Sequence, residues 1–105
     1  MTKHLRMATM IVLAAAMAAP VMAQGDAPAV YKAKCAMCHG ADGKGDTGIG
    51  KRVGLRSLQS PEVAKESDQL LFDITLNGKA KMPAYKGKLT DDQIKNLVKY
   101  MRSMK

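Results

Sequence analysis

The clearest hydrophobic pattern in this chain lies in residues 89–105. Four apolar residues there follow the spacing i, i+3, i+4, i+7: Ile94, Leu97, Val98 and Met101. That spacing places all four on one face of a helix. Thr90 and Gln93 stand three residues apart just before the pattern, the arrangement of a capping box. The segment therefore predicts a helix that begins after Thr90 and buries one face.

A second helix is expected before a glycine-rich segment. Residues 26–38 begin with Asp26, which is able to cap a helix, and carry Pro28 in the first turn, where its missing N–H costs nothing. The next segment, residues 39–54, is dense in glycine and therefore predicts a loop.

The middle of the chain predicts two short helices or one broken helix. Residues 60–66 open with Ser-Pro-Glu, a helix start signal, and residues 67–79 carry apolar residues at helical spacing before Asn77-Gly78. Residues 80–88 are again predicted to form a loop. No run of strand length alternates between apolar and polar positions, so the sequence predicts an all-α fold.

The first residues have the composition of a secretory signal. A short basic head precedes an unbroken apolar run over residues 7–19, and residues 20–23 end in small side chains. We predict a cleaved signal peptide, residues 1–23, and one folded domain, residues 24–105. A retained membrane anchor is the alternative, although the apolar run is shorter than the roughly 20 residues of a spanning helix. In either case the folded part lies outside the cytoplasm.

The chain is basic, with 17 lysines and arginines against 9 acidic residues and a formal net charge of +8. Such a charge suits nucleic acid, an anionic membrane surface or an acidic protein partner. Export argues against nucleic acid, and no recognition motif supports it. Because a domain this small has a modest core and the chain lacks tryptophan, material other than side chains is expected to help fill its centre.

Two cysteines and a histidine form a compact group of reactive side chains. Two residues separate Cys35 from Cys38, and His39 follows directly. The arrangement is compatible with a thiol–disulfide pair, with part of a zinc site, or with covalent attachment of haem.

The first two interpretations need features that the chain lacks. A thiol oxidoreductase carries its cysteine pair at the start of a helix beside a strand, whereas this pair ends a predicted helix. A structural zinc site needs four ligands, and residues 24–105 contain only Cys35, Cys38 and His39 as cysteine or histidine. Haem attachment uses all three residues, because both thiols add to the porphyrin vinyl groups and the histidine supplies an axial nitrogen to iron.

A second axial ligand is expected from methionine, since residues 24–105 contain no other histidine. Met37 lies inside the motif and cannot reach the opposite face of the porphyrin. The two methionines of the terminal helix are explained by packing. Met82 lies in a loop before Pro83, which keeps the preceding backbone extended. We therefore predict that His39 and Met82 bind the iron.

The order and spacing of these motifs resemble the small monohaem class I cytochromes c of bacteria. The matching stretches are YKAKCAMCHGADGKGD and NGKAKMPAYKGKLTDDQIKNLVKYMRS. The resemblance implies three to five helices wrapped around one covalently bound haem c, with Cys35 and Cys38 as thioether anchors and His39 and Met82 as axial ligands. It also implies a close crossing of the first and last helices, at four residues that pair on shared helix faces: Ala27, Tyr31, Leu97 and Tyr100.

The resemblance raises two questions about the surroundings of the haem. Many relatives direct a proline carbonyl at the histidine Nδ1–H, and here we expect a backbone carbonyl from residues 48–50 to replace it. Larger relatives use a tryptophan near the haem propionates, and this chain has none. The candidates for binding the propionates here are Lys51, Arg52 and backbone N–H groups.

The resemblance implies an electron carrier, not an enzyme, because protein fills both axial positions of the iron. We expect a monomer in the periplasm of a Gram-negative bacterium, cycling between Fe(II) and Fe(III) and touching membranes only through its partners. Those respiratory or photosynthetic partners would include a quinol-oxidising complex and a terminal oxidase or reductase. Six lysines that bracket the two motifs are candidates for steering the chain to acidic docking patches: Lys34, Lys44, Lys79, Lys81, Lys86 and Lys88.

Two alternatives to the carrier remain open. The methionine ligand could be labile, because its loop contains flexible residues, and the domain would then be a small-ligand sensor or a weak peroxidase. The domain could also be a permanently docked haem subunit of a larger oxidoreductase.

Overall fold

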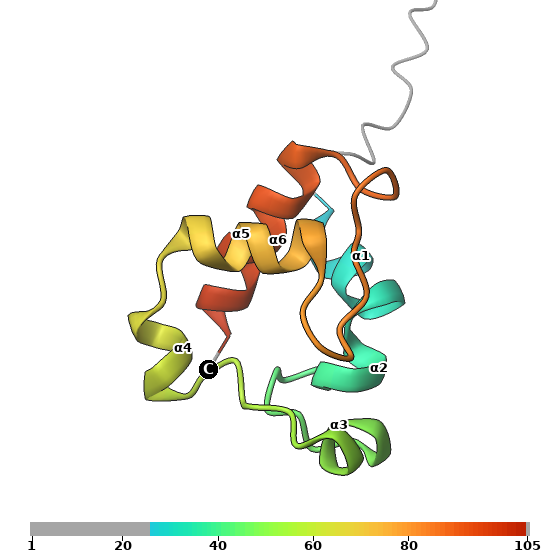
Figure 1. Cartoon of the computed structure of the whole chain (residues 1–105), viewed down its shortest axis with the longest axis vertical. Coiled ribbons are helices and arrows are strands. Elements are labelled where there is room, and N and C mark those ends of the chain that lie inside the picture. The colour runs from blue at the N-terminus through green and yellow to red at the C-terminus, as the bar shows by residue number, and fades with distance from the viewer. Residues whose placement is uncertain (1–25, 105) are drawn as a thin grey trace, which may run out of the picture.

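The computed structural model describes residues 26–104, and these residues form helices without strands (Figure 1). The six helices are α1 (Ala27–Lys34), α2 (Ala36–His39), α3 (Gly48–Val53), α4 (Pro61–Lys65), α5 (Asp68–Asn77) and α6 (Asp91–Ser103). The predicted signal peptide, residues 1–23, lies outside the described residues. Within the described part of the chain, no helix is long and apolar enough to cross a membrane.

The all-α prediction is confirmed, and so are most of the helix starts. Helix α6 begins at Asp91, directly after its N-cap residue Thr90, and both halves of the predicted capping box with Gln93 are present. The segment 60–79 forms two separate helices, each capped by the hydroxyl of a serine, Ser60 for α4 and Ser67 for α5. These hydroxyls accept hydrogen bonds from N–H groups that a helix start leaves without partners.

Two parts of the prediction are wrong. The first predicted helix is divided at Cys35 into α1 and α2, and the Asp26 side chain accepts no capping hydrogen bond. Asp26 has φ −111° and ψ 34°, whereas the capping serines and threonines have an extended backbone that turns the side chain toward the helix. The glycine-rich segment is not a loop throughout, because Thr47 caps the short helix α3. These two changes give six helices within residues 26–104, where three to five were expected.

Two buried clusters meet on α6. The first contains Tyr31, Leu89, Ile94 and Leu97, and the second contains Val63, Leu71 and Val98. Helix α6 therefore packs against α1 on one side and α5 on the other. The rings of Tyr31 and Tyr100 meet edge to face with centroids 5.5 Å apart, and Ala27 packs on the same cluster as Leu97. The predicted crossing of the first and last helices is confirmed.

The remaining segments enclose the space between these helices. Figure 1 shows α4 and α5 on one side, α1 and α2 on the other, and the segment between α5 and α6 running toward α2. A hydrogen bond of 2.9 Å from the Tyr85 hydroxyl to the Lys34 carbonyl joins that segment to the end of α1. The loop before α6 is therefore attached to the helix that precedes the cysteine motif.

Candidate functional site

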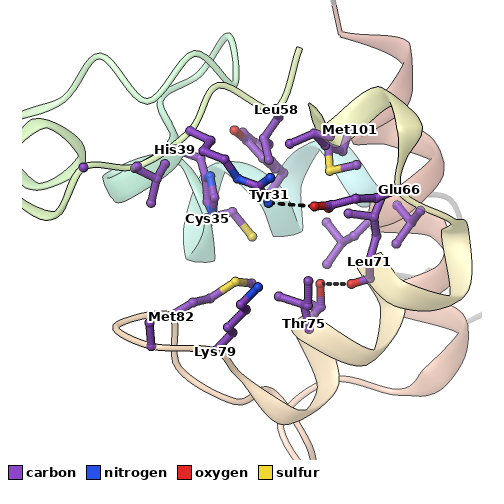
Figure 2. A pocket seen from close by; sticks show the side chains of 18 residues that line it. Tyr31, Cys35, His39, Leu58, Glu66, Leu71, Thr75, Lys79, Met82 and Met101 are labelled. Carbon is purple, nitrogen blue, oxygen red and sulfur yellow. Dashed lines mark hydrogen bonds and ion pairs between the residues drawn. The ribbon is translucent and has the colours of Figure 1, made fainter. Parts of the chain in front are cut away.

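A cavity of about 300 Å³ lies between α5, α6 and the cysteine motif, and most of its lining is apolar. Three of the four predicted site residues line it, namely Cys35, His39 and Met82, whereas Cys38 does not. Figure 2 shows His39 and Cys35 on one side of the cavity and Met82 with Lys79 on the other. The structure thus brings together side chains that are more than 40 positions apart in the sequence.

The first wall, which we call the His39 wall, consists of residues 35–50. Three consecutive carbonyl groups of this wall, at positions 38, 39 and 40, accept hydrogen bonds. The donors are the Thr47 hydroxyl at 2.7 Å, the Gly45 N–H at 2.7 Å and the Tyr31 hydroxyl at 2.6 Å. These bonds fix the backbone on both sides of His39 and so limit the directions in which its ring can point.

Helix α3 lies against this turn because Gly50 has no side chain. The Thr47 hydroxyl oxygen also accepts the Gly50 N–H at 2.8 Å, which caps α3. A Cβ atom on Gly50 would lie 2.3 Å from the Gly45 carbonyl oxygen and 2.8 Å from that of Cys38. Such distances are too short for a carbon atom, so only glycine permits this packing.

The His39 imidazole is largely buried, and burial lowers its pKa. The ring is therefore neutral at pH 7, the form that binds a metal ion. Its Nδ1 atom is covered by protein and has no hydrogen-bond partner among the described residues. The carbonyl expected from residues 48–50 does not reach it, and the Gly50 carbonyl instead accepts the Leu55 N–H at 2.9 Å. This part of the sequence prediction is wrong.

The Cys35 sulfur lies in the same wall, and Cys35 and Cys38 are not joined by a disulfide. Burial raises the pKa of the Cys35 thiol to about 11, against which Lys34 exerts a smaller opposite effect. The thiol is therefore protonated at neutral pH, whereas a thiol oxidoreductase needs a thiolate. The electrostatics of Cys35 do not favour disulfide exchange.

The second wall, which we call the Met82 wall, consists of residues 78–86. Met82 and Lys79 exchange two backbone hydrogen bonds, of 2.9 and 3.1 Å, across a tight turn. Ala80 within this turn has φ +53°, a left-handed conformation that costs a residue with a side chain about 1 kcal/mol. Gly78 precedes the turn, and a Cβ atom there would lie 2.8 Å from the Met82 carbonyl oxygen.

The rest of the Met82 wall is tied to α5. The N–H groups of Tyr85 and Lys86 donate to the carbonyls of Thr75 and Leu76 at 3.1 and 3.0 Å. These bonds use carbonyl groups at the end of α5 that would otherwise lack a partner. The segment predicted as a loop is thus a loop whose backbone is hydrogen-bonded along much of its length.

Several residues of the cavity were not found from the sequence. Met101 packs against the cluster of Val63, Leu71 and Val98, as predicted, but it also lines the cavity from α6 (Figure 2). Arg56 and Glu66 also line the cavity and form an ion pair of 2.9 Å. No local pattern identifies this pair, because folding brings it together across ten positions. Lys51 and Arg52, the predicted candidates for the propionates, do not line the cavity.

The residues present fit a haem. The cavity combines an apolar lining, a neutral imidazole on one side, a thioether sulfur on the opposite side and a protonated thiol next to the histidine. This is the donor set of a c-type haem with two protein ligands.

Comparison with known proteins points to the same cofactor. Residues 23–101 match the family described as "Cytochrome C oxidase, cbb3-type, subunit III". A cytochrome c6 of Leptolyngbya boryana is 36% identical over 72 residues, which cover 69% of this chain and 81% of that protein. A cytochrome c6 of Rippkaea orientalis is 38% identical over 90 residues, covering 83% of this chain and 78% of that protein. The solved structure of the KustC0563 c-type cytochrome is 34% identical with a TM-score of 0.70, over 76% of this chain and 98% of that one.

Proposed function

This chain belongs to the c-type cytochrome family as a monohaem electron-transfer protein with a covalently bound haem c, and we propose that four named residues hold that haem. Cys35 and Cys38 are the thioether anchors, and His39 and Met82 are the two axial ligands of the iron. The observation that carries this proposal is the approach of His39 and Met82 to one apolar cavity from opposite sides (Figure 2).

When bound, the haem supplies a one-electron couple between Fe(II) and Fe(III). The chain itself would orient the haem and shield its iron from water. Burial keeps the His39 imidazole neutral, and the thioether sulfur of Met82 favours the ferrous state, which raises the reduction potential. The hydrogen bonds of both walls fix the backbone that carries the two side chains, so we expect little reorganisation when the haem gains or loses an electron.

With both axial positions taken by protein, the iron offers no position for a substrate, and we infer a carrier with no catalytic activity. Export of the folded domain, residues 24–105, after removal of residues 1–23 would place it in the periplasm of a Gram-negative bacterium. There it would act as a monomer and exchange electrons with respiratory or photosynthetic complexes, such as a quinol-oxidising complex and a terminal oxidase or reductase.

The lysines around the two motifs support a docking role. All six are exposed: Lys34, Lys44, Lys79, Lys81, Lys86 and Lys88. The hydrogen bond between Tyr85 and the Lys34 carbonyl draws the two lysine-bearing segments together beside the cavity, and Lys79 itself lies in the cavity lining. An acidic partner would approach this face faster at low salt than at high salt.

A second candidate function is that of a haem subunit docked permanently in an oxidase, and the description of the matching family favours it. The two functions differ in how the protein is isolated. A subunit would co-purify with its enzyme from the native host, whereas a carrier would be recovered alone.

The ligand proposal is tested by spectroscopy on the haem-loaded protein. A pyridine haemochrome spectrum should report a haem bound by two thioethers, and a near-infrared band from methionine-to-ferric-iron charge transfer should be present at pH 7. Met82→Ala should abolish that band, lower the reduction potential and let the ferrous protein bind carbon monoxide.

Met101→Ala is the matched control, because Met101 also lines the cavity but enters it from α6. This variant should keep the near-infrared band. If Met101→Ala removes the band and Met82→Ala does not, the assignment of Met82 is wrong. Ready binding of carbon monoxide by the unmodified ferrous protein would favour the labile-ligand sensor or peroxidase instead.

A further inference from the structure

We propose that Arg56, held in place by Glu66, binds a propionate carboxylate of the haem, and that the opposite charges of this pair set the reduction potential in opposite directions. This inference rests on the proposed function, because it takes the haem to occupy the cavity between His39 and Met82. It names a side chain that contacts a haem propionate, which the sequence did not identify.

The cavity offers few charged side chains to a ligand. Among its lining residues, the acidic and basic side chains are Arg56, Glu66 and Lys79, and Lys79 belongs to the turn that presents Met82. Figure 2 shows Glu66 near Leu71 and Met101, away from Met82 and Lys79. The Arg56–Glu66 pair is therefore a second polar position in a lining that is otherwise mostly apolar.

A haem needs such a position. Its two propionates are its charged side groups, and they lie on the edge of the porphyrin away from the vinyl groups that Cys35 and Cys38 would bind. A carboxylate taken into an apolar cavity is costly unless hydrogen-bond donors meet it. Arginine is the side chain best suited to this task, because its planar guanidinium presents two parallel N–H groups to a carboxylate.

The Arg56 guanidinium has more N–H donors than its hydrogen bond to Glu66 uses. One Nη2 hydrogen bond of 2.9 Å goes to Glu66 Oε1, and the guanidinium makes no other hydrogen bond to the described residues. A guanidinium has five N–H donors, so several remain for a second carboxylate. The Arg56 side chain is about half exposed, at 49%, and is thus accessible from the cavity and from solvent.

Glu66 is held in place by hydrogen bonds of its own backbone. Its side chain is 18% exposed, and its backbone N–H donates to the Val63 carbonyl at 3.1 Å. Its backbone carbonyl accepts a hydrogen bond from Arg102 of α6, which also pairs with Asp68 at the start of α5. Among residues 26–104, Arg56 is the cation that pairs with the Glu66 carboxylate, whereas Arg102 binds its backbone carbonyl and Asp68.

The alternative cations are less suited to this role. Lys51 pairs with Asp46 at 2.9 Å, and both side chains are mostly exposed. Arg52 is exposed on the same short helix, and neither residue lines the cavity. Within the described residues, Arg56 is the arginine that reaches the cavity.

The two charges of the pair act on the iron with opposite signs. A positive charge beside the haem stabilises the ferrous state, which carries one positive charge less than the ferric state, and a negative charge stabilises the ferric state. Solvent screens such effects strongly for exposed charges and much less for charges at a largely apolar cavity. Removing Arg56 should therefore lower the reduction potential, and removing Glu66 should raise it.

The experiment is a potentiometric titration of the haem-loaded protein and four variants, with resonance Raman spectra of the propionate modes. Arg56→Gln should lower the potential and Glu66→Gln should raise it, each by up to about tenfold in the reduction equilibrium constant, or about 59 mV for one electron. Arg52→Gln and Glu62→Gln make the same changes of charge at exposed helix positions outside the cavity. These two controls should leave the potential and the propionate bands unchanged.

Shifts of the same sign for Arg56→Gln and Glu66→Gln, or shifts no larger than those of the controls, would overturn the proposal. If Arg56→Gln retains no haem, the proposal is tested with Arg56→Lys instead. That variant keeps the positive charge but loses the planar pair of N–H donors. Altered propionate bands at a nearly unchanged potential would then support the proposal, and unaltered bands would overturn it. The near-infrared methionine band of the same samples tests the axial ligands separately, so failure of one proposal is distinguishable from failure of the other.

Discussion

The His39 wall and the Met82 wall present their candidate ligands by different means. In the His39 wall, residues 35–50, the hydrogen bonds that fix the ligand mostly join positions less than ten apart, and Gly50 lets α3 lie directly on the motif. In the Met82 wall, residues 78–86, the turn depends on the end of α5 and on a hydrogen bond across 51 positions to Lys34. The first wall is mainly a local structure, whereas the second is held by bonds to the end of α5 and by one long-range bond to the end of α1.

Because the two walls are held by different contacts, destabilising substitutions in them should have different effects on the domain and on the ligand. The His39 wall continues into the packing of Tyr31 against α6, so a change there should destabilise the whole domain. The Met82 wall lies at the surface over much of its length, so a change there should release the ligand before the domain unfolds. Four substitutions test this contrast, beginning with the largest expected effect.

Gly50→Ala should cause the greatest loss of stability. The new Cβ atom would lie 2.3 Å from the Gly45 carbonyl oxygen, and backbone atoms cannot move aside cheaply. We expect a loss on the order of 3 kcal/mol in the free energy of unfolding, measured by denaturant titration of the haem-loaded protein. Gly48→Ala is the control, because nothing lies within 4 Å of a Cβ atom at that position of α3. Equal stability of the two variants would refute the importance of this close contact.

Gly78→Ala should act on the ligand more than on the domain. Gly78 has φ +77° and ψ 166°, a conformation almost restricted to glycine, and its Cβ atom would lie 2.8 Å from the Met82 carbonyl oxygen. The turn must then shift, at a cost of about 2 kcal/mol. The near-infrared methionine band should weaken in denaturant or heat well before the helical circular dichroism is lost. Simultaneous loss of both signals would mean that the two walls are not independent.

Local patterns in the sequence predicted much of the fold and of the candidate site. The helical spacing of Ile94 and Leu97 and the capping box at Thr90 depend on near neighbours, so α6 was predicted correctly. His39 and Met82 were identified because each lies in a short motif, and the structure places both at one cavity. The assignment of both as iron ligands stays a prediction.

The features that were missed depend on contacts between distant segments. Helix α3 was predicted as loop because its glycines count against a helix, although Thr47 provides a capping signal. The Arg56–Glu66 pair joins two segments that share no pattern. The strained turn at Ala80 is invisible in the sequence, because alanine gives no sign of a positive φ angle.

Tyr31→Phe should cost about 1 to 2 kcal/mol at pH 7, because the buried Gly40 carbonyl loses the hydroxyl that donates to it at 2.6 Å. Burial, followed by smaller effects of Cys35, Tyr100 and Asp42, raises the pKa of Tyr31 from 10.0 to about 12. The folded state therefore favours the protonated phenol. Its contribution is complete below pH 10 and is lost as the pH rises from 10 to 12.

The Phe variant should lose this alkaline dependence, so its deficit relative to the unmodified protein should shrink between pH 10 and 12. Denaturant titrations at pH 9 and pH 11 measure the change. Tyr85→Phe is the matched variant in the Met82 wall, where the hydroxyl donates to the Lys34 carbonyl in an exposed position. It should cost less in global stability and should weaken the methionine band more. A larger global loss for Tyr85→Phe would reverse the assigned roles of the two walls.

Ala80→Gly should give the smallest effect, and it should be a gain. Glycine adopts the left-handed conformation at φ +53° without the steric cost that alanine bears. Part of this benefit is offset by the greater entropy of glycine in the unfolded chain, so the net gain should stay below about 1 kcal/mol. The methionine band should then persist to higher denaturant concentration, while the global unfolding transition moves little.

Ala84→Gly is the control for that gain, because Ala84 is exposed in the same segment and does not have a positive φ angle. There glycine only adds flexibility to the unfolded chain, so the variant should be slightly less stable. If both substitutions weaken the methionine band, flexibility of the turn is harmful, and Ala80 is needed to position Met82 despite its strain. If Ala80→Gly alone strengthens the band, the strain at Ala80 limits how firmly the Met82 wall holds its ligand. The described non-glycine residues of the His39 wall all have negative φ angles, so that wall does not bear this strain.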